Sequence, residues 1–153
     1  MPIEEGLRAE FAAESEEHLD TIEATLTRGG TDRPTVDALF RAFHSLKGMS
    51  DAVGATGMKA LAHRAEDALG AARQGKLSLH AAALPLLAAA DALRAARAAL
   101  LDRDQDVPAP QPVLEALAAL LDAPPAPPPA AATPPVAPAR AGDPLKASLL
   151  SLA

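Results

Sequence analysis

The sequence contains no cysteine, no tryptophan and no tyrosine, and only three phenylalanines. Without cysteine the chain cannot form disulfides or a thiolate metal site, a composition that fits a reducing compartment. We therefore expect a cytoplasmic protein. Aromatic and β-branched residues, which β-strands prefer, are few, whereas alanine and leucine, which favour helices, are abundant. We expect an all-α fold with an aliphatic core.

The sequence also lacks clusters of basic residues, and its formal net charge is -6 at pH 7. Nucleic acids and anionic lipids are bound by clustered lysine and arginine, so we expect protein partners, with no nucleic acid and no membrane. The acidic start, Met1 to Glu5, lacks the basic beginning and apolar run of a secretory signal. The alanine-rich stretch at residues 81–90 is interrupted by Pro85, so no membrane-spanning segment is expected.

Apolar residues recur at spacings of three and four in four segments, which predicts four amphipathic helices. They cover about residues 4–27, 33–50 and 58–74 and some or all of 80–101, and short connections favour an antiparallel bundle. Gly29 and Gly30 mark the end of the first helix, and Asp32 with Pro34 is typical of the next start. Pro85 is expected in the first turn of the fourth helix or at a kink. A short fifth helix is predicted after Pro112.

Composition divides the chain into three parts. Residues 1–122 are expected to form the bundle. Residues 123–142 are almost entirely proline and alanine, which favours extended polyproline conformations, so we predict a disordered linker there. Residues 143–153 resemble the start of another helix, and we interpret them as the truncated beginning of a further segment of a longer protein.

His44 lies in the second predicted helix, at the edge of its apolar stripe. At about 100° per residue, this position anchors the backbone among core neighbours while the imidazole reaches solvent. Lys47 follows one turn later, and Gly48 stands four residues after the histidine. The imidazole therefore has a cation beside it and no side chain above it, an arrangement that suits a phosphoryl acceptor.

A reactive imidazole needs one nitrogen with a free lone pair, and a carboxylate that accepts a proton from the other nitrogen fixes that tautomer. Around the third predicted helix, Glu66 lies beside the apolar stripe, at about the angle that separates His44 from the stripe of the second helix. The two side chains can meet if the helices are antiparallel neighbours. Lys47 can supply positive charge to phosphoryl oxygens, and Gly48 permits a bulky partner to approach the ring.

The run His44-Ser45-Leu46-Lys47-Gly48 resembles the phosphorylation-site helix of CheA-type histidine-phosphotransfer (HPt) domains, the N-terminal domains of chemotaxis-type sensor histidine kinases. Residues 61–69 resemble the following helix of that family, including its His-x-x-Glu pattern. Residues 73–76 resemble its Arg-x-Gly turn. The resemblance covers about residues 7–101 and implies an HPt-like helical bundle.

This resemblance implies that His44 is the phosphorylated residue, Glu66 its hydrogen-bonding partner and Lys47 the activating lysine, with His63 as a nearby supporting group. It also implies two partners: a CheA-type kinase ATP-binding domain that supplies the phosphoryl group, and a CheY-like response regulator receiver domain whose aspartate accepts it. Met49 stands where many relatives have a small residue, so we expect the contact surface for the response regulator to differ.

We interpret the chain as a phosphoryl carrier without an ATP site, part of a larger kinase and not an enzyme itself. The alternative is a non-reactive helical adaptor that binds signalling proteins and in which His44 is incidental. No cofactor is expected, and the four histidines form no metal-binding pattern. The acidic residues of the first helix are interpreted as its solvated face. They are Glu14, Glu16, Glu17 and Asp20.

Overall fold

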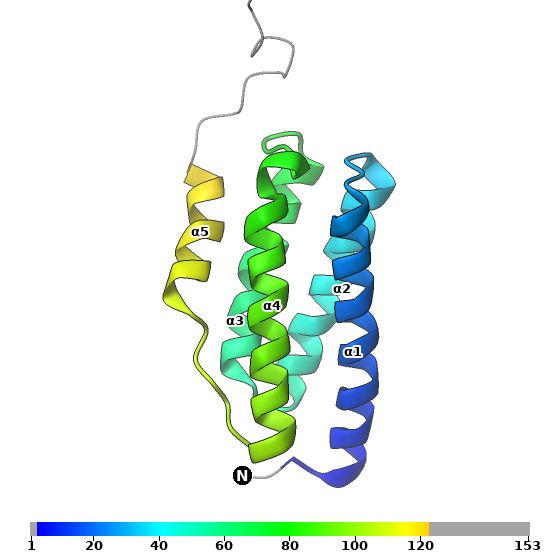
Figure 1. Cartoon of the computed structure of the whole chain (residues 1–153), viewed down its shortest axis with the longest axis vertical. Helices are drawn as coiled ribbons and strands as arrows, with labels where there is room; N and C mark the ends of the chain where they lie inside the picture. The colour runs from blue at the N-terminus through cyan, green and yellow to red at the C-terminus, as the bar shows by residue number, and fades with distance from the viewer. Residues whose placement is uncertain (1–2, 123–153) are drawn as a thin grey trace, which may run out of the picture. The chain divides into compact units, whose positions relative to one another are not determined.

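The computed structural model describes residues 3–122, which contain five helices and no strand. The helices are α1 (Glu5–Arg28), α2 (Arg33–Ala52), α3 (Thr56–Arg73), α4 (Leu79–Arg103) and α5 (Gln111–Asp122). Helices α1 to α4 run alternately up and down as an antiparallel bundle, and α5 packs against α3 and α4 (Figure 1). The expected all-α bundle with a short fifth helix is confirmed. The linker and the further segment predicted for residues 123–153 lie outside the described residues.

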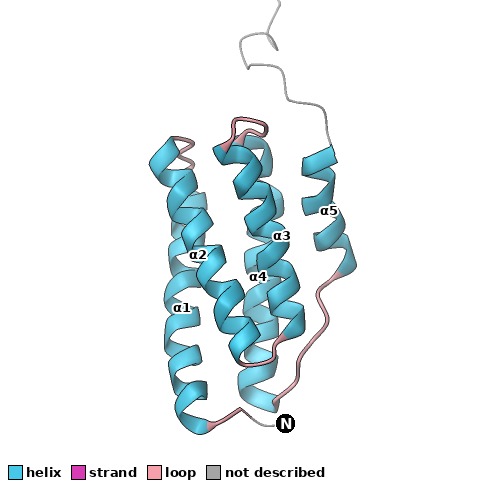
Figure 2. Cartoon of the chain, turned by 180° about the vertical axis from the view of Figure 1, so that it is seen from behind, coloured by secondary structure: helices cyan, strands magenta, loops and turns pink. Residues whose placement is uncertain are grey.

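Helices α2 and α3 pack against each other more extensively than any other pair, and they lie side by side when the bundle is viewed from behind (Figure 2). Their buried residues are aliphatic apart from one phenylalanine and a few polar groups. In α2 the buried apolar residues are Val36, Leu39, Ala42, Phe43 and Leu46, and in α3 they are Met58, Leu61, Ala62, Ala65, Ala68 and Leu69. None of the helices in residues 3–122 has an apolar stretch long enough to cross a bilayer.

Helix α1 ends and helix α2 begins at the residues that the sequence predicted. Gly29 follows α1 with a φ of 79°, the left-handed conformation that glycine adopts without strain. Pro34 lies in the first turn of α2, two residues after the N-cap Asp32. The carboxylate of Asp32 accepts a hydrogen bond from the Thr35 hydroxyl at 2.5 Å. Asp32 therefore occupies the N-cap position of α2, but its side chain does not cap a backbone N–H.

The start of α3 is capped by a residue from a distant part of the sequence. Thr56 and Gly57, which the sequence placed in a connection, are the first two residues of this helix. Asp106, in the loop between α4 and α5, accepts backbone hydrogen bonds from Thr56 at 2.9 Å and Gly57 at 3.0 Å, and another from the Thr56 hydroxyl. Burial alone would raise the pKa of Asp106, but these hydrogen bonds lower it. The loop thereby ties α5 to the beginning of α3.

Helix α4 continues through Pro85, which lies inside the helix and beyond its first turn. The first-turn alternative is therefore wrong, and α4 lacks the hydrogen bond that another residue would donate at this position. The heptad positions Leu86, Leu93 and Leu100 are buried as their spacing predicts. In α5 only Leu117 is fully buried, and Val113, Leu114 and Leu120 are partly buried against the core.

Two arginines of α4 bind the polar face of α1. Arg94 donates hydrogen bonds to Asp20 at 2.6 Å and Glu23 at 2.8 Å, and Arg97 donates to the Ser15 hydroxyl at 2.7 Å. The acidic residues Glu14, Glu16, Glu17 and Asp20 are all exposed, as expected for a solvated face. Asp20 also pairs with Arg94, so the face of α1 next to α4 includes charge pairs beside its apolar contacts.

We predict opposite effects for two alanine substitutions at glycines inside helices. A Cβ at Gly57 would lie 1.9 Å from the carbonyl oxygen of Val107, so Gly57→Ala should lower the free energy of unfolding by about 1–3 kcal/mol through overpacking. A Cβ at Gly48 would meet nothing within 4 Å, so Gly48→Ala should raise stability by about 0.5–1 kcal/mol through better helix propensity. Urea unfolding of both variants measures this. Equal stability of Gly57→Ala and the parent would contradict the close approach of the loop.

Candidate functional site

His44 lies on α2 between core residues and solvent. Its side chain is 62% exposed, whereas Phe43 and Leu46 on the same helix are fully buried. The helix backbone is therefore anchored by its apolar face, and the imidazole stands on the surface. This agrees with the position expected from the helical period.

Glu66 reaches across from α3 and contacts both predicted neighbours on α2. Its oxygen Oε2 is hydrogen-bonded to Nδ1 of His44, and its oxygen Oε1 accepts a hydrogen bond from Nζ of Lys47 at 2.5 Å. The Glu66 side chain is only 10% exposed. The structure thus brings together the three residues that the sequence proposed for one site, because α2 and α3 are antiparallel neighbours.

The two α2 partners keep the Glu66 carboxyl ionised. Its burial alone would raise the pKa of Glu66, but hydrogen bonds from Lys47 and His44, together with the charges of these groups, lower the pKa below its ordinary value of 4.5. An ionised carboxylate can only accept hydrogen bonds, so Nδ1 of His44 carries the proton. In the neutral imidazole the lone pair is then on Nε2, which is directed away from Glu66.

Lys47 and Gly48 shape the approach to this nitrogen. The Lys47 side chain is 27% exposed, so its ammonium group is held beside the imidazole yet remains accessible from solvent. Gly48 is exposed, and nothing inside the bundle would touch a side chain there. Internal packing therefore does not explain why glycine stands at this position, four residues after His44.

Phe40 and Arg73 also adjoin the site, and sequence reasoning did not assign them to it. The Phe40 ring is parallel to the His44 ring within 6°, with centroids 6.2 Å apart. The Arg73 guanidinium lies over the Phe40 ring, 4.7 Å from its centroid. Phe40 is half-buried against the core, and its spacing of four residues from His44 is the signal that places both on one helix face. No comparable signal exists for Arg73.

The remaining histidines stand apart from this cluster. His63 lies 3.7 Å from Asp67 on its own helix, and within the described residues it makes no hydrogen bond or ion pair with His44, Lys47 or Glu66. Its supporting role stays a prediction. His80 is exposed, and His18 is half-buried. Residues 3–122 contain no group of three side chains that can hold a metal ion.

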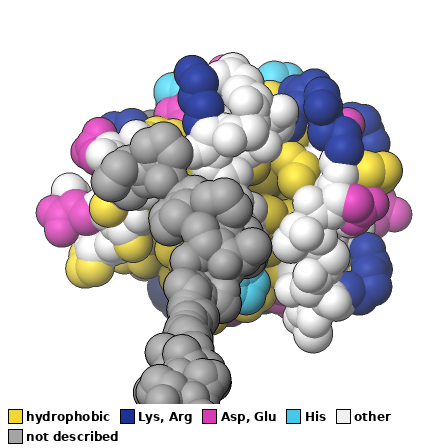
Figure 3. Space-filling view, turned by 90° about the horizontal axis from the view of Figure 1, so that it is seen from above, with side chains coloured by type: hydrophobic (Ala, Val, Ile, Leu, Met, Phe, Trp, Pro, Cys, Tyr) yellow, Lys and Arg dark blue, Asp and Glu magenta, His cyan; other side chains and the backbone are white. Residues whose placement is uncertain are grey.

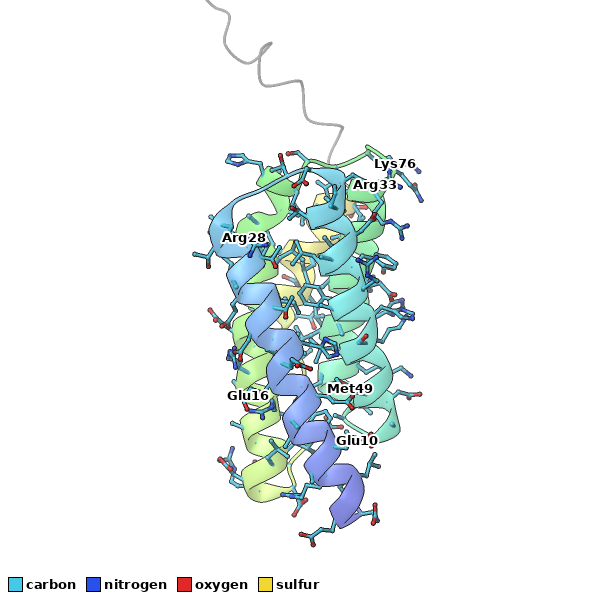
Figure 4. All side chains as sticks on the ribbon, turned by 90° about the vertical axis from the view of Figure 1, so that its right-hand side faces the viewer. Glu10, Glu16, Arg28, Arg33, Met49 and Lys76 are labelled. Carbon is cyan, nitrogen blue, oxygen red and sulfur yellow. The ribbon has the colours of Figure 1, made fainter. Side chains whose placement is uncertain are left out.

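Met49 follows Gly48 and borders a cavity of about 230 Å³ between α1 and α2. Glu10 and Phe11 of α1 line the same cavity, and Figure 4 shows Met49 and Glu10 in the lower half of the two helices. The methionine is half-buried, so its side chain fills part of the groove beside Gly48. The surface next to the site is therefore shaped by a large apolar residue at this position.

Comparisons with known proteins place this geometry in a family context. Residues 6–99 match a family described as Hpt domain. The chain is 40% identical over 72 residues to chemotaxis protein CheA of Bacillus subtilis (strain 168), covering 45% of this chain and 11% of that protein. It is 43% identical over 86 residues to chemotaxis protein CheA of Cereibacter sphaeroides, covering 53% of this chain and 12% of that protein. The matched part is thus about one tenth of each relative's length.

A solved structure has the same fold. It is a crystal structure of the phosphorylated P1 domain of CheA3 in complex with CheY6 from R. sphaeroides. The two structures superpose with a TM-score of 0.70 at 28% sequence identity, over 76% of this chain and 95% of that chain.

We predict an unusual tautomer for His44. In the parent at about pH 8, where histidine is neutral, ¹⁵N chemical shifts should report a protonated Nδ1 and an unprotonated Nε2, because Glu66 accepts from Nδ1. Glu66→Ala should shift the population toward the Nε2-protonated form. His80, exposed on α4, serves as the internal control and should not respond. A His44 tautomer that is the same in parent and variant would rule out control by Glu66.

We also predict that the stabilising effect of Glu66 depends on pH. Because the pKa of Glu66 in the folded chain is below its ordinary value of 4.5, its charge stabilises the fold fully above that pH, and this stabilisation is lost as pH falls through the lower folded pKa. The stability difference between the parent and Glu66→Gln should therefore shrink between about pH 5 and about pH 3 in urea unfolding. Glu17→Gln, at an exposed position on α1, is the control. A difference that stays constant over this range would contradict the ion pairing.

Proposed function

The chain belongs to the Hpt domain family, and from this membership we propose that it is a histidine phosphotransfer module of a chemotaxis-type two-component phosphorelay, with His44 as the phosphorylated residue. One observation carries the proposal. An exposed imidazole donates from Nδ1 to a buried, ionised carboxylate, which leaves the lone pair of Nε2 free on the surface of the bundle.

In the proposed first step, Nε2 of His44 attacks the γ-phosphorus of ATP bound to a CheA-type kinase domain. A nitrogen–phosphorus bond forms as the bond from phosphorus to the oxygen of ADP breaks. The imidazole gains positive charge, which the Nδ1–H hydrogen bond to Glu66 stabilises. Lys47, beside the ring, supplies a mobile positive charge to the phosphoryl oxygens.

In the proposed second step, a carboxylate oxygen of an aspartate in a CheY-like receiver domain attacks the same phosphorus. The nitrogen–phosphorus bond breaks, and Nε2 recovers its lone pair while Nδ1 keeps its proton. The open surface at Gly48 supports such a transfer, because the receiver must bring its own active site up to the ring. The similar P1 domain of CheA3 that was crystallised with CheY6 supports a receiver as the partner.

We infer that the module carries the phosphoryl group and does not itself bind ATP. Its relatives are about nine times longer than the matched segment, which supports a kinase region elsewhere in a longer protein. Because its phosphorylation consumes ATP, we propose that it acts in the cytoplasm. Glu66 and Lys47 act on His44 in this proposal, and His63 supports the site from α3.

We predict that the purified chain is phosphorylated on His44 by a CheA-type kinase domain with radiolabelled ATP. The product should be labile in acid and stable in base, as a phosphoimidazole is. His44→Gln should abolish labelling, whereas His80→Gln, which changes an exposed histidine on α4, should label at the parent rate. Labelling of His44→Gln at the parent level would refute the proposal. A non-reactive adaptor would bind a receiver domain equally well with either histidine replaced and would transfer nothing.

A further inference from the structure

We propose that Phe40 and Arg73 are positioning residues, which hold the plane of the His44 ring so that Nε2 faces the incoming phosphorus. This inference rests on the proposed function and deepens it. The geometry joins Asp37, Arg73, Phe40 and His44 in one chain of contacts across the surface of α2 and α3.

The hydrogen bond to Glu66 leaves part of the His44 orientation undetermined. It restrains one atom, Nδ1, while the side chain turns about two bonds and is 62% exposed. Exposed side chains lack the surrounding contacts that select a single rotamer in a core. A nucleophile gains most from a bound geometry in which its lone pair is already aligned. The ring therefore needs a second restraint on one of its faces.

Phe40 provides such a restraint. It lies one turn before His44 on α2, is half-buried and packs against the core cluster. Its ring is parallel to the imidazole within 6°, and the 6.2 Å between centroids is in the range of offset stacking. The backbone of α3 also passes beside Phe40, because a Cβ at Gly70 would lie 3.8 Å from Phe40 Cε2. Phe40 is thus a flat, anchored surface against which the exposed ring can rest.

Arg73 holds Phe40 from the end of α3. Its guanidinium lies 4.7 Å from the Phe40 centroid, within the range of a cation–π interaction. Its Nε lies 3.0 Å from Oδ1 of Asp37, which is one turn before Phe40 on α2. Asp37 also lies 3.5 Å from Arg33, which Figure 4 labels at the same end of the bundle as Lys76.

The end view of the bundle shows lysine and arginine side chains at several places around the rim, with acidic side chains among them (Figure 3). Arg73 differs from an ordinary surface cation because it is 40% exposed and has two partners, a carboxylate and an aromatic face, on the helix that carries His44. Phe40 and Glu66 also border one cavity of about 480 Å³. The aromatic contact acts on the face of the imidazole, and the carboxylate contact acts on Nδ1 at its edge.

The test compares Phe40→Leu, which keeps an apolar side chain but removes the ring, with Phe40→Tyr, which keeps the ring. In the unphosphorylated chain, three-bond NMR couplings of His44 should report one side-chain orientation in the parent and in Phe40→Tyr, and averaged orientations in Phe40→Leu. With a CheA-type kinase domain and ATP, Phe40→Leu should lower kcat about twofold to tenfold with KM for the chain unchanged, and Phe40→Tyr should restore it.

Two further variants separate positioning from general loss of packing. Leu93→Val reduces a fully buried side chain on α4, away from the site, and should leave the His44 couplings and kcat at parent values. Arg73→Gln keeps the Phe40 ring but removes the guanidinium that lies over it. It should change the His44 couplings and kcat in the same direction as Phe40→Leu, but by less.

Parent values of both readouts in Phe40→Leu would overturn the proposal, and parent values in Arg73→Gln would remove Arg73 from it. A parent chain that takes no phosphate on His44 would refute the proposed function instead. In that case the couplings alone still decide whether Phe40 orients the ring.

Discussion

The ionised carboxylate of Glu66 is the group on which the site depends. It is nearly buried, and a buried charge is stable only when it is paired and hydrogen-bonded. Lys47 and His44 supply that pairing from the neighbouring helix. The same contact that stabilises the carboxylate assigns the proton to Nδ1, and so leaves Nε2 available for chemistry. Electrostatic stabilisation of the fold and the proposed activation of the histidine therefore rest on one interaction.

This interaction requires α2 and α3 to stay in a fixed register. Their apolar faces supply most of the contact, but α3 is also held at its beginning by Asp106 from the α4–α5 loop. That cap is possible only because Gly57 has no side chain and lets the loop backbone pass close to the helix. Arg94 joins α4 to α1 on the opposite side of the bundle. The helices that carry the site thus sit in a scaffold restrained by polar contacts as well as by the core.

The site itself is built with less local stability than its helix would allow. Gly48 stands in the interior of α2, where it costs roughly 1 kcal/mol relative to alanine and no internal contact needs it. The imidazole of His44 stands in solvent beside it. Both features are unfavourable or neutral for folding, and both fit the proposed approach of a partner to Nε2. Met49 adds a large apolar group to the same surface, where it borders the groove between α1 and α2.

Local sequence determined the helices, their glycine and proline signals and the exposure of His44, because these follow from the 3.6-residue period and from the conformations of single residues. The same period gave the position of Glu66 relative to the apolar stripe of its helix. Its contact with His44 could therefore be expected once the two helices were assumed to be neighbours. The tertiary structure alone decided that Asp106 caps α3, that Asp20 binds Arg94, and that Arg73 covers Phe40. Each of these pairs joins residues far apart in the chain. Their contact depends on the rotation and axial register of packed helices, which the periodicity of one helix does not contain.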